Sequence, residues 1–83
     1  MSKVMAIPPG TTIKEQLKNR GMTQRDFAFR MNMPDADTNQ LLNGDMPLTI
    51  EIALKLENVF GLSASFWINL EKIYREKLAR IKK

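Results

Sequence analysis

Helix start and stop signals recur along this chain, and they constrain its fold more than any other feature of the sequence. Apolar side chains recur every three or four positions in successive stretches. Each of the first four stretches is closed by a residue that tolerates the left-handed backbone, namely Gly21, Asn32, Gly44 or Gly61. No stretch alternates apolar and polar residues as a half-buried strand does. The pattern predicts an all-α fold with five short helices.

The residues at the helix ends set the expected bounds. Thr12 and Glu15 have the spacing of a capping box. Thr23 and Thr49 are typical N-caps. The paired prolines near the end of residues 1–10 favour an extended arm before the first helix. The expected helices cover about residues 12–20, 23–32, 34–43, 49–60 and 63–83.

Composition limits the size of the fold and the chemistry open to it. The 83 residues suffice for one small core, so residues 1–83 should form a single domain that benefits from a partner covering one face. There is no cysteine and no histidine, which removes thiolate ligands and the usual nucleophile and base pairs. We therefore expect no enzyme, no metal site and no cofactor.

Charge and hydropathy narrow the partners and the compartment. The formal net charge of +4 suits an acidic partner such as nucleic acid. The apolar runs are far shorter than the roughly 20 residues that span a bilayer. Residues 1–10 also lack a signal-peptide pattern. We expect a cytoplasmic protein with no membrane partner.

Asp35, Asp37 and Asn39 stand at alternating positions, as the first ligands of an EF-hand calcium loop do. Such a loop needs glycine at its sixth position and a bidentate glutamate at its twelfth, where this chain has Gln40 and Met46. Acidic residues in the first turn of a helix instead interact favourably with its dipole, by roughly 0.3–1 kcal/mol each. The stretch therefore favours a helix start over a calcium site.

Residues 23–44 have the order of a helix-turn-helix, with two short helices joined by a tight turn. Ala28 is small where the second helix must cross closely. Four apolar side chains should fill the wedge between the two helices: Phe27, Met31, Met33 and Leu41.

The stretches "TQRDFA" and "LLNG" resemble those of the XRE, or Cro/CI-like, helix-turn-helix family. The flanking stretches "IPPG" and "FWINL" narrow the resemblance to the HigA-type antidote proteins of toxin–antitoxin modules. The resemblance spans about residues 7–78 and implies a five-helix fold of the lambda-repressor type with a long C-terminal helix.

The resemblance also implies which residues meet DNA. The start of the second helix would hold a phosphate, and the exposed face of the third would enter the major groove. Asparagine and glutamine there can pair with adenine, and aspartate can accept from cytosine. The implied DNA-binding residues are Thr23, Gln24, Arg25, Asp35, Ala36, Asp37, Asn39, Gln40 and Asn43.

Four positions depart from the family pattern. Asn32 replaces the usual turn glycine, and Thr38 replaces a core aliphatic residue, so its hydroxyl needs a partner such as the carbonyl one turn back. Asp35 and Asp37 stand where neutral or basic residues are usual. A like charge about 8–10 Å from a phosphate costs some 0.4–0.5 kcal/mol in water. DNA affinity should be weak unless basic residues compensate, for which the chain offers Lys14, Lys18, Arg20, Arg25 and Arg30.

The last helix carries more apolar residues than a small bundle can cover. We expect Phe66, Leu70 and Ile73 to dock its first half, and Trp67 to join the core. The apolar stripe then continues outward. We expect this outer stripe to be an oligomer or partner interface, formed by Tyr74, Leu78 and Ile81.

These observations lead to two functional hypotheses. The first is a DNA-binding regulator that acts as the antitoxin and autorepressor of a HigBA-like module, with operator DNA, a cognate toxin and a second copy of the chain as partners. The alternative is a protein-interaction module, or the N-terminal part of a metallopeptidase-fused regulator, whose DNA-binding face has degenerated.

Overall fold

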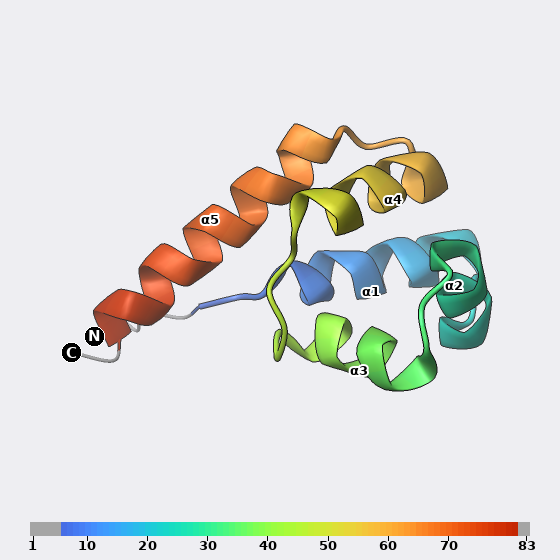
Figure 1. Ribbon diagram of the computed structural model, residues 1–83, viewed down its shortest axis with the longest axis horizontal. Coiled ribbons are helices and arrows are strands. Elements are labelled where there is room, and N and C mark those ends of the chain that lie inside the picture. Colours follow the sequence, from blue (N-terminus) through green and yellow to red (C-terminus); the bar gives the residue numbers. More distant parts are fainter. Residues whose placement is uncertain (1–5, 82–83) are drawn as a thin grey trace.

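The computed structural model describes residues 6–81, and all regular secondary structure in that range is helical. The helices are α1 (Pro9–Arg20), α2 (Gln24–Met31), α3 (Asp35–Asn43), α4 (Ile50–Phe60) and α5 (Ala64–Ile81). Helices α1 to α4 form the body of the molecule, and α5 packs on it with one end and extends away with the other (Figure 1). The predicted all-α, five-helix fold is confirmed.

Most of the helix ends lie where the sequence places them. The Thr23 hydroxyl accepts from the Asp26 N–H at 3.0 Å, and the Thr49 hydroxyl accepts from the Ile52 N–H at 3.2 Å. Pro34 is the N-cap of α3, so the helix begins at Asp35, one residue later than expected. All four closing residues have the left-handed backbone, with φ of 64°, 55°, 78° and 83° at Gly21, Asn32, Gly44 and Gly61. The cap residues therefore predicted three N-termini within about two residues.

The core lies where α1, α2, α3, α4 and the start of α5 meet. Phe27 of α2 stacks on Phe60 of α4 with ring centroids 5.6 Å apart, and Trp67 of α5 lies 6.0 Å from Phe60. Trp67 is fully buried, which confirms its predicted place in the core. The guanidinium of Arg20 lies over the Phe60 ring and donates to the Phe60 carbonyl at 2.8 Å. This contact joins the end of α1 to the end of α4.

The first helix begins earlier than expected, so the prediction of an extended arm over residues 1–10 is wrong at its inner end. Helix α1 starts at Pro9, with Pro8 as an N-cap that makes no side-chain hydrogen bond. Proline is favoured in the first helical turn, where its missing N–H has no intrahelical partner to lose. Thr12 lies inside the helix and is not its cap. Residues 1–5 of the expected arm lie outside the described residues.

Gly10 lets α1 approach the end of α3 closely. It is buried, and a Cβ placed on it would lie 2.1 Å from the Leu42 carbonyl oxygen. No larger residue fits there without separating the two helices.

Helix α5 docks on a different face from the one we expected. Phe66 and Ile73 are 39% and 42% exposed, whereas Trp67 and Tyr74 are buried. Residues seven apart lie on one face of a helix, so Trp67 and Tyr74 form the docked stripe. The predicted docking set of Phe66, Leu70 and Ile73 was wrong in two of its three members, because Leu70 alone is partly buried against the core.

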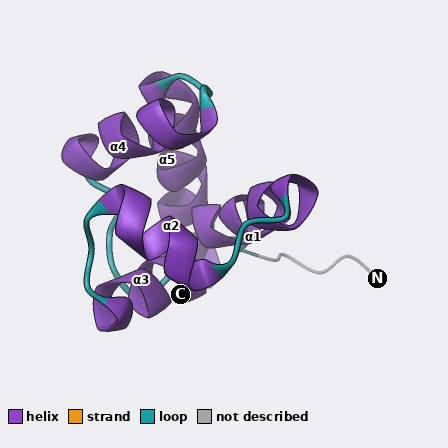
Figure 2. Ribbon diagram, turned by 90° about the vertical axis from the view of Figure 1, so that its right-hand side faces the viewer, coloured by secondary structure: helices purple, strands orange, loops and turns teal. Residues whose placement is uncertain are grey.

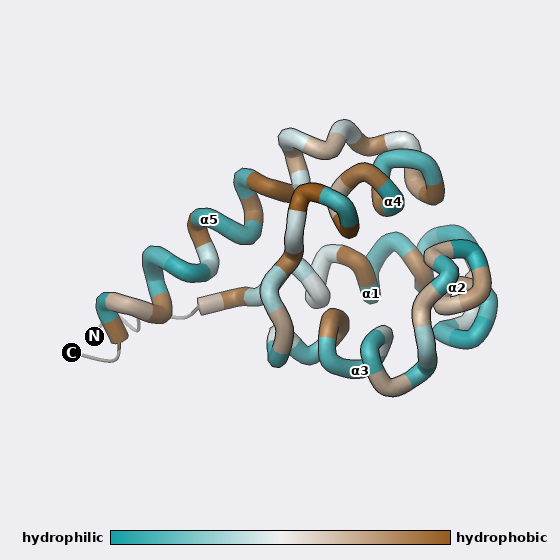
Figure 3. Tube along the Cα trace, in the orientation of Figure 1, coloured by the Kyte–Doolittle hydropathy of each residue, from teal (hydrophilic) through white to brown (hydrophobic). Residues whose placement is uncertain are grey.

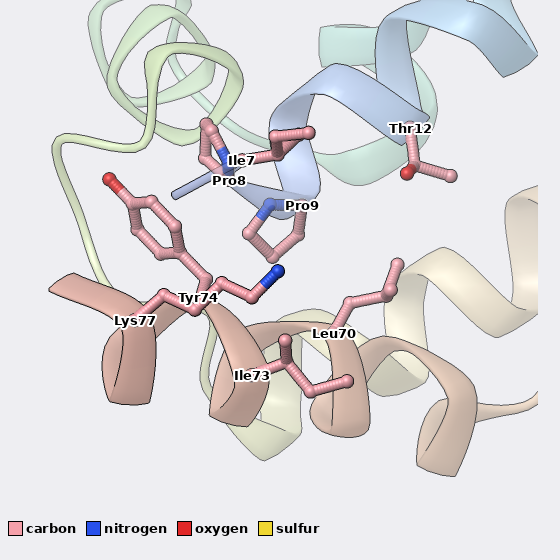
Figure 4. A pocket seen from close by; sticks show the side chains of 8 residues that line it. All are labelled: Ile7, Pro8, Pro9, Thr12, Leu70, Ile73, Tyr74 and Lys77. Carbon is pink, nitrogen blue, oxygen red and sulfur yellow. The ribbon is translucent and has the colours of Figure 1, made fainter. Parts of the chain in front are cut away.

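The placement of Tyr74 on an exposed outer stripe was also wrong. Its ring reaches from α5 toward Pro8, beside the groove between α5 and the start of α1 (Figure 4). This groove has a volume of about 220 Å³ and is mainly apolar; it is lined by Ile7, Pro8, Pro9, Thr12, Leu70, Ile73, Tyr74 and Lys77. Further along the helix, Leu78 is half-buried and Ile81 is 48% exposed. The early start of α1 thus covers Tyr74 but leaves Ile81 uncovered.

Candidate nucleic-acid interface

Helices α2 and α3 lie next to each other, with α2 at the end of the bundle opposite the outer end of α5 (Figures 1 and 2). Their inner faces are buried and include Phe27, Ala28 and Met31 from α2, and Thr38, Leu41 and Leu42 from α3. Met33, in the turn between them, is partly buried against the same core. This is the wedge that the sequence predicts for a helix-turn-helix.

The start of α2 has a complete capping box. Besides the Thr23 cap, the Asp26 carboxylate accepts from the Thr23 N–H at 3.4 Å. The next two backbone N–H groups, of Gln24 and Arg25, belong to the first helical turn and have no intrahelical acceptor. They point toward the positive end of the helix dipole, where an anion binds favourably. Thr23, Gln24 and Arg25 are exposed, so the geometry leaves this end open to a phosphate.

Helix α3 exposes the side chains that the resemblance assigns to the major groove. All six predicted residues are exposed: Asp35, Ala36, Asp37, Asn39, Gln40 and Asn43. Their exposure is a consequence of the buried stripe, because Thr38, Leu41 and Leu42 turn the opposite side of α3 to the core. The helix therefore offers a mostly polar face with no lysine or arginine.

The same regular helix rules out the calcium-loop geometry. Asp35, Asp37 and Asn39 follow one another at steps of two residues, and such positions on an α-helix point to nearly opposite sides. Ligands from an EF-hand loop must instead converge on one ion. Among residues 6–81, no group of three acidic, histidine or cysteine residues is placed to hold a metal ion.

Hydrophobic patterning did not reveal a side-chain contact between the two helices. The amide nitrogen Nε2 of Gln24 donates a hydrogen bond to Oδ1 of Asn39. Gln24 is the first residue of α2, and Asn39 lies in the middle of α3. Two exposed polar residues 15 positions apart carry no periodic signal, so only the folded structure places them together.

Thr38 finds the partner that the sequence led us to expect. Its hydroxyl donates to the Pro34 carbonyl at 2.9 Å, and the same carbonyl accepts from the Thr38 backbone N–H at 2.9 Å. The side chain is fully buried. A polar residue in this core position is therefore hydrogen-bonded within its own helix start.

The basic residues near the motif differ in whether their side chains already make hydrogen bonds within the bundle. Arg20 is exposed, but its guanidinium already donates to Gln16 at 3.1 Å and to the Phe60 carbonyl, so it helps to stabilise the bundle. Four further exposed basic residues lie in and before the motif: Lys14, Lys18, Arg25 and Arg30. The negative charges on α2 and α3 partly offset these positive charges; they belong to Asp26, Asp35 and Asp37.

The fold and the exposed start of α2 and face of α3 together define a helix-turn-helix DNA-binding domain. A family model described as Helix-turn-helix (HTH_3) matches residues 13–67, about two thirds of the chain. The chain is 36% identical over 66 residues to the uncharacterized HTH-type transcriptional regulator YddM of Escherichia coli K12, covering 80% of this chain and 70% of YddM.

Solved structures of similar proteins narrow the assignment. An addiction module antidote protein of a HigA family from Coxiella burnetii is 32% identical, with a TM-score of 0.85 over 93% of this chain and 85% of that one. Pseudomonas aeruginosa antitoxin HigA, solved with the higBA promoter, shares the fold with a TM-score of 0.86 at 23% identity; the match covers 94% of this chain and 86% of that one. The chain belongs to the helix-turn-helix family of DNA-binding regulators and, within it, to the HigA-type antitoxins.

These relatives favour the antitoxin hypothesis over the fused interaction module.

No helix among residues 6–81 is long and apolar enough to cross a membrane.

Proposed function

We propose that this antitoxin represses its own operon by binding a palindromic operator as a dimer. The observation that carries the proposal is the pairing of an open, phosphate-accepting start of α2 with an exposed polar face of α3. The structure of Pseudomonas aeruginosa antitoxin HigA with the higBA promoter supports the proposal, because that protein has the same fold. A two-fold dimer would place two α3 helices in successive major grooves.

The DNA contact is expected to depend strongly on salt. Backbone N–H groups and exposed basic residues supply the phosphate contacts, and these contacts release counterions. Asp35 and Asp37 reduce the attraction because they lie on the helix that enters the groove. Affinity should therefore fall steeply with added salt.

The protein acts by binding and performs no reaction. Its second macromolecular partner is the cognate toxin of the module, an RNA-cleaving protein. The outer end of α5 is the surface for self-association or for that toxin, since Leu78 and Ile81 continue an apolar stripe beyond the body of the bundle. Tyr74 supports this surface from beneath, because it is buried.

Gel-shift titrations against the chain's own promoter, at 50 mM and 200 mM salt, test the regulatory proposal. We expect a shift at the lower salt and a large loss of affinity at the higher salt. Well-folded protein that gives no shift at 50 mM salt would contradict autorepression.

Sedimentation of wild type and Leu78→Glu tests the dimer. We expect the wild type to be a dimer and the variant to dissociate, because a buried unpaired carboxylate opposes the contact. Glu76→Gln, on the exposed side of the same helix, is the control and should leave the mass unchanged. A monomeric wild type at high concentration would remove the dimer from the proposal.

A further inference from the structure

One side of α5 carries an apolar stripe that the bundle leaves largely uncovered. Its members follow one another at steps of three or four residues and so share one face of the helix. Three of them are exposed and one is partly buried, with a lysine between the last two; we call Phe66, Leu70, Ile73, Lys77 and Ile81 the α5 stripe. Part of this stripe also lines the groove against the start of α1. The α5 stripe is therefore an unpartnered, mainly apolar surface.

The charge along the α5 stripe is positive on balance. Lys77 lies on the stripe, and Arg80 flanks its outer end; both are exposed. Of the two acidic residues of α5, Glu76 lies on one flank, whereas Glu71 is already bound to the Arg75 guanidinium at 2.7 Å. Two copies of the stripe placed face to face would bring net positive charges together, which opposes that contact. A partner surface that is apolar and acidic fits the stripe better.

The outer face of α4 has both of these properties. Ile50 and Leu54, one helical turn apart, are 69% and 50% exposed. Glu51 and Glu57 stand three residues before and after Leu54, and both are exposed. Lys55, the one basic residue of this helix, is half-buried. The α4 face, formed by Ile50, Leu54, Glu51 and Glu57, is thus an apolar pair with an acidic border.

The α4 face cannot cover the α5 stripe of its own chain. It turns away from the bundle, because the opposite side of α4, with Ile52, Ala53 and Leu56, is buried. Helix α4 also packs beside the first half of α5, and the outer half extends away from it (Figure 1). The two complementary surfaces can meet only when two copies come together.

We propose that the α4 face of one copy docks on the α5 stripe of a second copy. A two-fold axis repeats the contact with the roles of the copies exchanged, so each dimer contains it twice. The inference rests on the dimer of the proposed function and names the two surfaces that form it.

Charge reversal on each surface tests this pairing in sedimentation equilibrium at low salt. One variant combines Glu51→Lys with Glu57→Lys, and the other combines Lys77→Glu with Arg80→Glu. In each variant both contacts of the dimer join like charges, so the Kd for dimerisation should rise at least about tenfold. An equal mixture of the two variants should recover the wild-type Kd within about threefold. In the mixed dimer, both contacts again join opposite charges.

Recovery in the mixture also shows that both variants are folded, and circular dichroism checks each one alone. Should either double variant fail to fold, the single reversals Glu57→Lys and Lys77→Glu give the same comparison with a smaller effect, of about threefold.

Leu54→Gln tests the apolar part of the contact without changing charge. The Kd should rise at least about tenfold, because half of the Leu54 side chain is left for a partner to bury. The matched control is Phe29→Gln, which removes an apolar side chain that is 86% exposed on α2. It should leave the Kd unchanged.

Three outcomes would overturn the inference, and they differ in what they leave standing. A monomeric wild type would remove the dimer and leave the stripe to another occupant, such as the toxin; gel shifts test DNA binding separately. If the wild type dimerises but the α4 variants leave the Kd unchanged, the dimer stands and the α4 face is wrong. If the mixture dimerises as weakly as its components, the two surfaces do not face each other.

Discussion

Helices α3 and α5 differ in the number and size of the side chains that attach them to the bundle. Helix α3 has nine residues and buries three of them, whereas α5 has eighteen and buries only Trp67 and Tyr74. The buried residues of α3 are small or medium-sized and lie on one side of a helix that ends at the left-handed Gly44. Helix α5 depends on two large aromatic side chains.

The difference follows from how each sequence distributes its apolar residues. In α3 the large apolar residues are Leu41 and Leu42, so one face is the obvious choice for the core. In α5 apolar residues lie on several faces, as the alternating hydropathy along its outer half shows (Figure 3). The face that docks is therefore chosen by what the rest of the bundle presents, namely Phe60 and the start of α1.

Of the substitutions that test this comparison, Trp67→Ala should have the largest effect on stability. Because Trp67 is one of two anchors of α5, its removal should lower the free energy of unfolding by about 3–5 kcal/mol. That is a large share of the roughly 5–10 kcal/mol expected for a domain of this size. Urea denaturation measures the effect.

Phe66→Ala is the matched control, since Phe66 is the adjacent aromatic residue but is 39% exposed. We expect it to cost at least 2 kcal/mol less than Trp67→Ala. Equal losses would mean that α5 does not depend on the Trp67 face.

A second substitution asks whether the outer half of α5 is docked through Tyr74. Tyr74→Ala should cost about 3 kcal/mol, because the ring is buried beside the start of α1. Ile73→Ala, at the neighbouring and 42% exposed position, should cost about 1 kcal/mol or less. If urea denaturation showed Ile73→Ala to be the more destabilising substitution, α5 would dock through the face expected from the sequence, formed by Phe66, Leu70 and Ile73.

The sequence predicted features that depend on neighbours along the chain. Thr23, Thr49 and Gly44 mark helix ends through hydrogen bonds and backbone conformations within a few residues. The acceptor for the Thr38 hydroxyl is one turn away and was also predicted. The exposed side of α3 followed from the position of Leu41.

Contacts between distant segments were not predictable in this way. The Gln24–Asn39 bond joins two polar residues on different helices, and the contact of Gly10 with Leu42 joins the first helix to the third. Tyr74 was misplaced for the same reason, since its cover comes from Pro8 at the other end of the chain. These features depend on how helices cross, which periodicity alone does not specify.

On the DNA-facing side, the acidic residues of α3 provide a smaller test. Asp37→Asn removes a negative charge that repels the DNA phosphates. The repulsion from each phosphate 8–10 Å away is about 0.4–0.5 kcal/mol, so the affinity should rise about three- to fivefold at low salt when about two phosphates lie within that distance. Glu76→Gln makes the same change in charge on α5 and should have little effect. Gel-shift titration measures both. No gain for Asp37→Asn would place this residue away from the DNA backbone.

The smallest expected effect concerns the one buried polar residue of α3. In Thr38→Val the hydroxyl bond to Pro34 is lost, but the Pro34 carbonyl keeps its bond from the backbone N–H of residue 38. No buried polar group is left unpaired, and a methyl group replaces the hydroxyl in a fully buried site. The free energy of unfolding should therefore stay equal or rise by up to about 1 kcal/mol.

Two further variants separate the hydroxyl from the methyl group of Thr38. Thr38→Ser keeps the hydroxyl and should lose about 1 kcal/mol, because it removes a buried methyl group. Thr38→Ala removes both groups and should lose at least as much. If urea denaturation showed Val to be less stable than Ser, the hydroxyl bond would be the main contribution of Thr38. Helix α3 would then be anchored by a specific polar contact, as α5 is by its aromatic rings, and not by a generic apolar face.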